Sequence, residues 1–371
     1  MKFTCNSTDF VEALSTATHA LPVRTTVQIL EYVMLETDEN DDLRITCSDG
    51  TLTMITKCSV SVKEGGSCLL PGRLLAEISR KLPVGDMTFD TTNNTSAVIK
   101  CMGSRTSIAY RPSSLYPRPT EMADVTAEQE IELPQALLKD MILKTSFAIA
   151  VDEERPILTG CLLESAGGEA RMVALDGFRM AIRMQRVSPD DQLYAVIPGK
   201  ALQEIARLLS DDEERMITIR VAGGHMYTIV DSTQVITVLK EGKYINYRMI
   251  IPAEWKTQAD VDAGLLSDCV ERASLMAREG KNNLVKLDIG NDMIVITSNS
   301  EIGDVHEEVE ADIEGEALKI AFNVKYLSDA LKSIDGKRIR MWFNTSVTPC
   351  VIVPADSDEF THMILPVRMQ G

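Results

Sequence analysis

Pairs of basic residues seven positions apart recur three times along this chain, each pair in a short segment with the apolar periodicity of a helix. Seven residues are two helical turns, so both cations of a pair lie on one side of the helix. Two stacked cations suit the neutralisation of nucleic-acid phosphates, a chemistry that requires no reading of bases. The three pairs are Arg73 and Arg80, Lys200 and Arg207, and Lys325 and Lys332, in segments 69–82, 196–209 and 321–334.

The spacing of these segments indicates an internal repeat. Lys200 follows Arg73 by 127 residues and Lys325 follows Lys200 by 125, so each copy belongs to about one third of the 371-residue chain. A basic pair on one helix is usually a solvated face. Three similar basic faces arranged around a centre would instead form a concave cationic surface.

Each segment also has the features that a buried amphipathic helix needs. The helices should open at Pro71, Pro198 and Asn323, residues that suit a first turn without donor partners. Apolar residues at offsets of two, five and nine from the first cation trace one helical face. They are Leu75, Ile78 and Leu82, then Leu202, Ile205 and Leu209, then Leu327, Ala330 and Ile334.

The remaining pattern of each third is similar. Amphipathic helices are expected at Thr8 to Ala20, Pro134 to Ile149 and Leu265 to Ala277, each followed by strands, the basic helix and more strands. This order predicts an α+β fold of three similar domains, with helices on one face of a mostly antiparallel sheet. We expect the domains to be 1–125, 126–253 and 254–371.

Composition favours a globular cytoplasmic protein. Hydrophobic residues make up 44% of the chain, with no run long enough to span a bilayer and no signal-peptide pattern. The eight cysteines have no metal-binding spacing and are expected to be reduced core residues. The net charge is −17, but acids concentrate at expected turns such as Asp38 to Asp42, so an acidic exterior would surround a cationic lining.

The sequence lacks the motifs of common catalytic and metal sites. It has no phosphate-binding glycine loop, no paired-histidine zinc motif and no serine nucleophile elbow. We therefore expect no catalytic residue, metal or cofactor. A metal-dependent hydrolase that uses an acidic cluster such as Asp211 to Glu214 is disfavoured, because no histidine accompanies the acids.

Several motifs, in order along the whole chain, resemble the bacterial sliding clamp family, the beta subunit of DNA polymerase III. This resemblance implies a non-enzymatic processivity factor for DNA replication. Its fold would have three clamp domains per chain, and two chains would close head to tail into a ring around double-stranded DNA, with helices inside. The motifs are MKFT at Met1, PVRTTVQIL (22–30), LPGR (70–73), LDGFRMA (175–181), VIPGK (196–200), NYRMIIP (246–252), FNVKYL (322–327) and ILPVRM (364–369).

The resemblance assigns DNA contacts to Arg24, Arg73, Lys200 and Arg207, and the repeat adds Arg80 and Lys325. The loop 152–157 departs from the family, because Asp152, Glu153 and Glu154 are acidic where polar and aromatic residues are common. No DNA contact is expected from this loop.

The resemblance also implies a hydrophobic cleft that binds short linear peptides of DNA polymerases, the clamp loader and repair proteins. Phe178 and Ile245 replace residues common in the family, so the preferred peptide is expected to differ. Methionines suit a groove that accepts several ligands, because thioethers repack. The matching cleft positions are Leu158, Leu175, Gly177, Phe178, Arg179, Met180, Tyr247, Met249, Ile250, Val347, Met363, Leu365, Pro366, Val367 and Arg368.

A homodimer contact is expected between the edge strand 105–110 of one chain and the last domain of another. Ile108 is the expected buried anchor, whereas Thr106 stands where a large apolar residue is usual and predicts a weaker interface. An alternative is therefore a monomeric protein-interaction scaffold that does not close on DNA. Either protein would be cytoplasmic, and the clamp would be associated with the nucleoid. The assigned contact residues are Arg105, Thr106, Ile108, Leu275, Met276, Asp304, Glu307 and Glu308.

Overall fold

The computed structural model describes residues 1–92, 95–152, 154–188, 192–280 and 283–369. The chain forms two compact units, each made of two stretches of sequence. The first unit contains Met1–Gln135 and Arg207–Leu239, and the second contains Ala136–Ala206 and Lys240–Gly371. Each unit joins parts of neighbouring thirds, so the expected domain boundaries remain a proposal.

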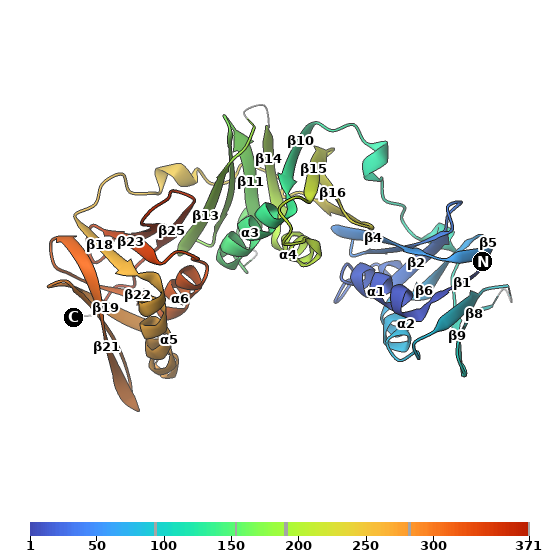
Figure 1. The fold of residues 1–371 in the computed structure, drawn as a ribbon, viewed down its shortest axis with the longest axis horizontal. Helices are drawn as coiled ribbons and strands as arrows, with labels where there is room; N and C mark the ends of the chain where they lie inside the picture. The colour runs from blue at the N-terminus through green and yellow to red at the C-terminus, as the bar shows by residue number, and fades with distance from the viewer. Residues whose placement is uncertain (93–94, 153, 189–191, 281–282, 370–371) are drawn as a thin grey trace. The chain divides into compact units, whose positions relative to one another are not determined.

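The first unit contains two antiparallel sheets with helices α1 and α2 packed together beside them (Figure 1). One sheet has the strand order β5-β1-β7-β8-β9 and the other has the order β10-β15-β16-β17-β4-β3-β2-β6. Its elements are β1 (Lys2–Asn6), α1 (Ser7–Thr18), η1 (Gln28–Glu31), β2 (Tyr32–Thr37), β3 (Asp42–Ser48), β4 (Leu52–Ser59), β5 (Ser61–Glu64), β6 (Ser67–Pro71), α2 (Gly72–Ser79), β7 (Asp86–Asp90), β8 (Ser96–Cys101), β9 (Ser104–Ala109), η2 (Ser113–Leu115), η3 (Met122–Asp124), β10 (Gln129–Pro134), β15 (Met216–Ala222), β16 (His225–Val230) and β17 (Thr233–Val238).

The described strands of the second unit follow one another in the order β14-β11-β12-β13-β25-β24-β23-β18-β21-β20-β19-β22. Helices α5 and α6 pack on each other and on these strands (Figure 1). Helix α4 (Gly199–Leu208) crosses the boundary between the units. The other elements are α3 (Gln135–Thr145), η4 (Ser146–Ala148), η5 (Pro156–Thr159), β11 (Gly160–Ala166), β12 (Glu169–Leu175), β13 (Arg179–Arg186), β14 (Leu193–Pro198), η6 (Tyr247–Met249), β18 (Thr257–Asp262), α5 (Ala263–Glu279), β19 (Leu284–Gly290), β20 (Met293–Ser300), β21 (Gly303–Gly315), β22 (Leu318–Asn323), α6 (Val324–Lys332), β23 (Arg338–Phe343), β24 (Cys350–Pro354) and β25 (Phe360–Ile364).

Local sequence explains where the helices begin. The Asn6 side chain accepts from the backbone N–H of Thr8 at the start of α1, and Asn323 accepts from that of Lys325 at the start of α6. Both caps satisfy donors that lack helical partners. Helices α2 and α4 begin directly after Pro71 and Pro198, as expected.

The apolar periodicity of the recurring helices is largely confirmed. Leu75, Leu202 and Leu327 are fully buried in the three recurring helices. Ile78, Leu82 and Ile334 are only half-buried, because Ile78 lies in the last turn of α2 and the other two lie just beyond the ends of α2 and α6. Apolar burial of this kind is the main stabilising contribution to an α+β fold.

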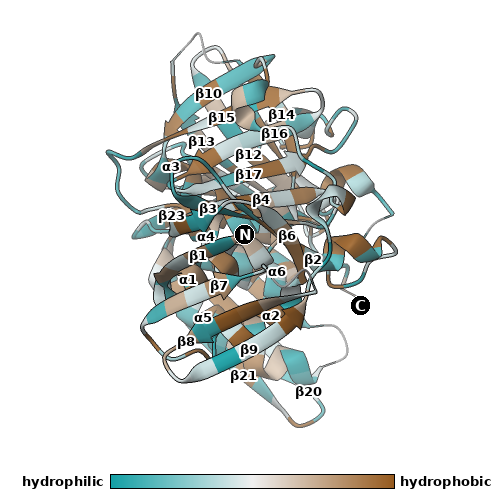
Figure 2. Cartoon of the chain, turned by 90° about the vertical axis from the view of Figure 1, so that its right-hand side faces the viewer, coloured by the Kyte–Doolittle hydropathy of each residue, from teal (hydrophilic) through white to brown (hydrophobic). Residues whose placement is uncertain are grey.

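Polar and apolar residues are interleaved within single elements in both units (Figure 2). Among the described residues, no helix is long and apolar enough to span a membrane. All eight cysteines are free thiols, and all except the half-buried Cys5 are buried. Burial raises the pKa of the Cys161 thiol to about 12, so this thiol stays protonated at neutral pH.

Candidate functional site

Three of the predicted DNA-binding residues lie in the first unit on or beside α2. Arg24, Arg73 and Arg80 are all exposed. Arg73 Nη2 donates to the carbonyl oxygens of Pro22 and Val23, at 2.6 and 3.1 Å. These bonds hold its guanidinium next to the backbone that carries Arg24. The structure therefore brings these two cations into one local patch.

Helix α4 carries two more of the predicted cations. Arg207, in the first unit, has its Nη1 atom 2.9 Å from Nδ1 of His19, the residue that caps the C-terminus of α1. Lys200 lies in the first turn of α4, is exposed and belongs to the second unit. Both cations therefore belong to one helix, as their seven-residue spacing predicted.

The cations of α6 differ from each other in their surroundings. Lys325 is exposed in the first turn, whereas Lys332 Nζ lies 2.6 Å from Glu271 Oε1 on α5. A hollow of about 360 Å³ between α5 and α6 is lined by three cations, Arg278, Lys325 and Lys332, and one acid, Asp329. This surface is cationic, although a carboxylate partly neutralises the second member of the predicted pair.

The predicted peptide-cleft residues, all in the second unit, separate into a buried base and an exposed rim. The base belongs to one apolar cluster that joins strands β11, β12 and β13 to β24, β25 and η6. Strand β13 pairs with β25, which places Met180 directly opposite Met363. The predicted residues in this cluster are Leu158, Leu175, Met180, Tyr247 and Met363.

Three more predicted residues with large apolar side chains lie in η6 or shortly before β13 or β24 in the chain, and they remain open to solvent. Met249 is 83% exposed, and Phe178 and Val347 are each 58% exposed. Isolated exposed apolar residues are common on proteins, but several beside one apolar cluster indicate an interaction surface. The other rim residues are Gly177, Ile250 and Arg368, which are exposed, and Leu365, Pro366 and Val367, which are half-buried.

Arg179 has a different place from the one that the cleft assignment predicts. Its side chain is 8% exposed and donates to Asp176, Asp329 and the carbonyl of Phe147, at 3.0, 2.5 and 2.6 Å. The Phe178 ring stacks against Tyr326 with centroids 6.1 Å apart. Arg179 therefore braces the rim from below, since its donors are used within the chain.

Tyr247, a member of this apolar cluster, is fixed by a polar contact. Its hydroxyl donates to Glu164 Oε1 at 2.6 Å, and Arg248 Nη2 donates to the same oxygen at 2.5 Å. Burial and then the bond to Glu164 raise the pKa of Tyr247 well above its usual value. The phenol therefore remains a donor at neutral pH.

The sequence-based assignment missed several residues that support the cleft. Leu162, Val173, Tyr244 and Val351 belong to the same apolar cluster as Met180. Leu162 and Val173 lie in short, nearly continuous buried strands, and such apolar runs predict burial but not the partner strand. Trp255 and Trp342 stack with centroids 4.1 Å apart, and Trp342 packs against the cluster.

Two open strand edges carry the predicted subunit contact. Strand β9 is the last strand of its sheet and contains Arg105 and Thr106. In β21, residues 303–310 pair only with β20, because β18 pairs with residues 311–315. The second edge carries the exposed acids Asp304 and Glu308, and Glu307 pairs there with Arg272 at 2.6 Å.

Ile108, the expected buried anchor, is already buried within the single chain. Its side chain is only 5% exposed in the single chain, so a partner would cover little more of it. Beside β9 lies a groove of about 670 Å³, whose lining combines apolar, polar and charged residues: Leu74, Glu77, Ile78, Arg80, Lys81, Leu82, Ser104 and Thr106. Leu74 was missed, although it is an exposed leucine next to Arg73 on a helix whose apolar face lies elsewhere.

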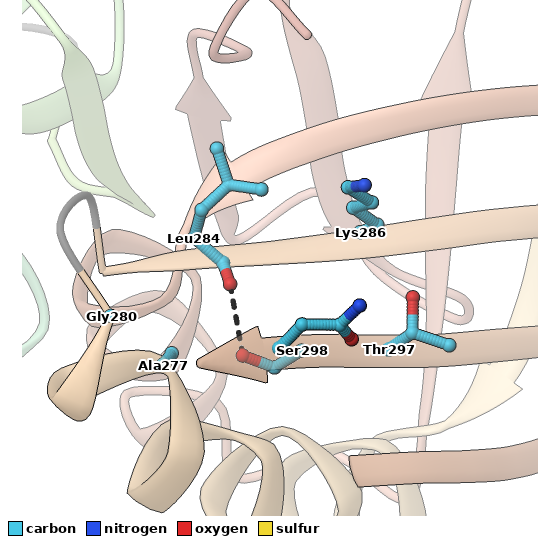
Figure 3. A pocket seen from close by; sticks show the side chains of 7 residues that line it. Ala277, Gly280, Leu284, Lys286, Thr297 and Ser298 are labelled. Atoms are coloured by element: carbon cyan, nitrogen blue, oxygen red, sulfur yellow. Dashed lines mark hydrogen bonds between the residues drawn. The ribbon is translucent and has the colours of Figure 1, made fainter. Parts of the chain in front are cut away.

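The predicted third-domain contacts lie at the C-terminal half of α5. Leu275 is 66% exposed, and Met276 is half-buried with its sulfur 2.8 Å from Ser300 Oγ. A cavity of about 210 Å³ lies beside this helix end, where Ser298 Oγ donates to the Leu284 carbonyl at 3.1 Å (Figure 3). Among the described residues of its lining, the charged one is Lys286.

The acidic loop at Asp152 is held by a hydrogen bond within the loop. Asp152 and Glu154 are described, and Asp152 caps the loop by accepting from the Glu154 backbone N–H at 2.9 Å. Glu153 lies outside the described residues. In the part of the chain that the structure describes, no group of three His, Cys, Asp or Glu side chains is arranged to hold a metal ion.

These features define a class of repeated α+β proteins that combine basic helices with an apolar peptide-sized surface. The chain belongs to the DNA polymerase III beta subunit family, the bacterial beta sliding clamps. It matches the N-terminal domain of that family over residues 1–120, the central domain over 132–246 and the C-terminal domain over 248–368.

Individual relatives agree with this family over the full length. A beta sliding clamp of Staphylococcus aureus is 34% identical over 379 aligned positions, which cover 99% of each chain. The crystal structure of the Bacillus subtilis DNA polymerase sliding clamp matches with a TM-score of 0.94 at 32% identity over both whole chains. A Pseudomonas aeruginosa sliding clamp bound to griselimycin matches with a TM-score of 0.91 at 25% identity, also over both whole chains. The predicted clamp fold is confirmed.

Proposed function

We propose that two copies of this chain close head to tail around duplex DNA and tether DNA polymerase and other proteins to it. The observation that carries this proposal is the recurrence of exposed cations on α2, α4 and α6. Such helices attract phosphates without reading bases, and a closed ring needs no affinity for a sequence. We infer a cytoplasmic protein that works at the nucleoid and catalyses no reaction.

Complementary edges support the head-to-tail arrangement. Strand β9 carries Arg105, and the open part of β21 carries Asp304 and Glu308. Pairing between these edges would satisfy their unpaired backbone groups and place charges of opposite sign together. The groove beside Thr106 is open to an exposed apolar side chain of a second chain, such as Leu275.

The apolar surface around Met180 and Met249 is the proposed cleft for short peptides of polymerases, the clamp loader and repair proteins. Its buried base and exposed apolar rim fit an extended peptide with large apolar side chains. The Pseudomonas aeruginosa relative was solved bound to griselimycin, which supports a ligand site in this family. The position of that site on this chain is part of the proposal.

Retention on circular DNA tests the proposal directly. Light scattering across a dilution series should give about twice the chain mass of 40.9 kDa. The same sample, loaded on nicked circular DNA by a clamp loader, should stay bound at high salt and leave when the circle is cut. Charge attraction alone weakens with salt and does not depend on free ends. A monomer, or binding indifferent to cutting, would instead indicate the scaffold that does not close on DNA.

A further inference from the structure

A second groove lies in the first compact unit, apart from the DNA, dimer and peptide sites described above. It has a volume of about 280 Å³ and lies between η1, the turn from β3 to β4, the segment 117–120 and strands β16 and β17. Val27 is 51% exposed and Val238 is 37% exposed at its margin, while Leu30 and Ile236 are buried at its base. The groove is therefore apolar and accessible.

The turn at this groove repeats the turn at the peptide cleft. Between β3 and β4, Asp49 Oδ1 accepts from the backbone N–H groups of Thr51 and Leu52, both at 2.8 Å. Between β12 and β13, Asp176 Oδ1 accepts from the backbone N–H groups of Phe178 and Arg179, at 2.9 and 3.0 Å. The glycines after these aspartates have φ values of +92° and +94°. The two turns therefore share one left-handed geometry.

The short helices that precede the two sites also correspond. In η1, Ile29 and Leu30 come just before β2, and in η5, Ile157 and Leu158 come just before β11. Both leucines are buried. Leu30 belongs to an apolar cluster with Tyr116, in the linker between β9 and β10, and Leu158 belongs to one with Tyr244, in the linker between β17 and β18. One leucine supports each site from the same topological position.

The linkers that close the two sites make matching contacts. Arg118 Nη2 donates to Glu36 on β2 at 2.9 Å, and Arg248 Nη2 donates to Glu164 on β11 at 2.5 Å. Burial raises the pKa of Tyr116 and of Tyr244 far above the usual value for tyrosine. In each site, an arginine of the linker is therefore bound to a glutamate on the strand that follows the short helix, β2 or β11.

The strand that completes each site comes from the next part of the chain. Strand β4 pairs with β17, so that Thr53 lies opposite Ile236. Strand β13 pairs with β25, so that Met180 lies opposite Met363. The turn, the short helix, the linker and the added strand therefore occur at both sites. The groove in the first unit lies at the position that corresponds to the proposed peptide cleft in the second unit.

The lining of the groove indicates the chemistry of its occupant. Val27, Leu30, Ile236 and Val238 would take branched aliphatic or aromatic side chains, as apolar pockets do. Arg118 and His225 also line it, although the chain as a whole carries a net charge of −17. Arg118 is bound to Glu36 through one nitrogen, and a guanidinium has five N–H donors. An anionic peptide is therefore favoured over a cationic one.

We propose that this groove is a second peptide site, which binds a short extended segment of a partner protein with large apolar side chains and a carboxylate. The inference rests on the proposed function, because the peptide cleft supplies the pattern that the groove repeats. A clamp with both sites would hold two peptide segments per chain, and multivalent binding of one partner would raise its apparent affinity.

Photo-crosslinking with the full-length chain tests this site. The probe is the acetylated hexapeptide Ser-Asp-Leu-Gly-Leu-Phe with benzoylphenylalanine in place of the phenylalanine, and adducts are mapped by mass spectrometry. We expect adducts both at 117–120 or 225–238 and at 245–250 or 345–350. Val238→Asp should reduce the first group at least about tenfold and spare the second, and Val347→Asp should do the reverse. Val84→Asp, at an exposed site outside both grooves, is the matched control.

A charge exchange at Arg118 gives a second test that does not depend on correct folding of Val238→Asp. Arg118→Glu should weaken labelling of 117–120 or 225–238 by the aspartate peptide and restore it for the same peptide with lysine instead. The absence of adducts at those segments, or adducts there that neither Val238→Asp nor Arg118→Glu changes, would overturn the second site. Absence of adducts at 245–250 and 345–350 alone would overturn the peptide cleft of the proposed function instead.

Discussion

Arg179 Nη1 lies 2.5 Å from Asp329 Oδ2, so a single ion pair joins strand β13 to helix α6 within the second unit. The same guanidinium donates to Asp176 and to the carbonyl of Phe147, and its Cζ atom lies 4.6 Å from the centroid of the Tyr326 ring. Phe178, the residue before Arg179, stacks on Tyr326. The ion pair therefore fixes one wall of the proposed peptide cleft.

Arg179→Ala should lower the free energy of unfolding of the second unit by about 3 kcal/mol, because it leaves the partly buried Asp329 without its partner. Both tryptophans, Trp255 and Trp342, lie in this unit, so their fluorescence during urea unfolding reports on it. Lys319→Ala is the control, since Lys319 pairs with Asp288 at an exposed site and should contribute less than about 1 kcal/mol. Equal losses for both variants would show that Arg179 is not a brace.

Acid should destabilise the second unit through His362. Its Nε2 atom lies 3.0 Å from Ser333 Oγ, which donates to the Ala330 carbonyl, so Nε2 carries the proton and donates. The Nδ1 atom is buried and has no hydrogen-bond partner among the described residues. Burial, and then the charge of Lys144, lower the pKa of His362 to about 3.

The direction of the pH effect follows from this lowered pKa. The unfolded state takes up a proton near pH 6.5, whereas the folded state does so near pH 3, so stability falls as pH decreases through this interval. By pH 5 the loss should be about 2 kcal/mol. Urea unfolding of His362→Phe should be less dependent on pH by that amount, while the exposed His306→Asn should behave as the unchanged chain. Identical pH profiles for all three proteins would contradict this assignment.

The recurring helices were predictable because periodicity, helix starts and basic pairs are local properties of the sequence. The pairing of β4 with β17 and of β13 with β25 was not predictable in this way. Those strands lie far apart in sequence, and alternation predicts a buried strand without naming its neighbour. The same limit explains why Tyr244 and Val351 were missed at the base of the cleft.

The positions of single side chains also depended on contacts that the sequence does not reveal. Arg179 was expected to line the cleft, but three acceptors within the chain hold it below the rim. Lys332 was expected to be the second member of a cationic pair, but Glu271 on α5 partly neutralises it. Periodicity places a residue on a helix face, and only the packed neighbour determines its charge environment.

Leu275→Asp should convert the proposed dimer into a monomer. An exposed leucine at the C-terminal half of α5 would pack on the apolar residues of the groove beside Thr106, and an aspartate in its place would lose this apolar burial and carry the cost of desolvating a charge. We expect the dissociation constant to rise at least about 100-fold, which corresponds to roughly 3 kcal/mol. Sedimentation velocity measures this change. Leu265→Asp, on the same helix and similarly exposed, should remain dimeric, and a dimeric Leu275→Asp protein would place the contact elsewhere.

Met249→Ser should weaken binding of an apolar peptide to the proposed cleft by about tenfold, because an exposed thioether on the rim would be buried by the ligand. Fluorescence polarisation of a labelled peptide measures the affinity. Met216→Ser, which alters an exposed methionine of β15 in the first unit, should leave it unchanged. Equal affinities of the two variants would remove Met249 from the rim of the site.

Lys325→Ala should reduce the salt dependence of binding to linear duplex DNA more than Lys332→Ala. Lys325 is exposed, and among the described contacts its ammonium group has no carboxylate partner, whereas Lys332 already pairs with Glu271. Each lost phosphate contact should decrease the slope of log K against log salt by about 0.9. Fluorescence anisotropy across a salt series gives this slope. Lys319→Ala, at the exposed ion pair on β22, should leave the slope unchanged. A larger effect of Lys332→Ala would mean that DNA displaces Glu271 and that the basic pair acts as first predicted from the repeat.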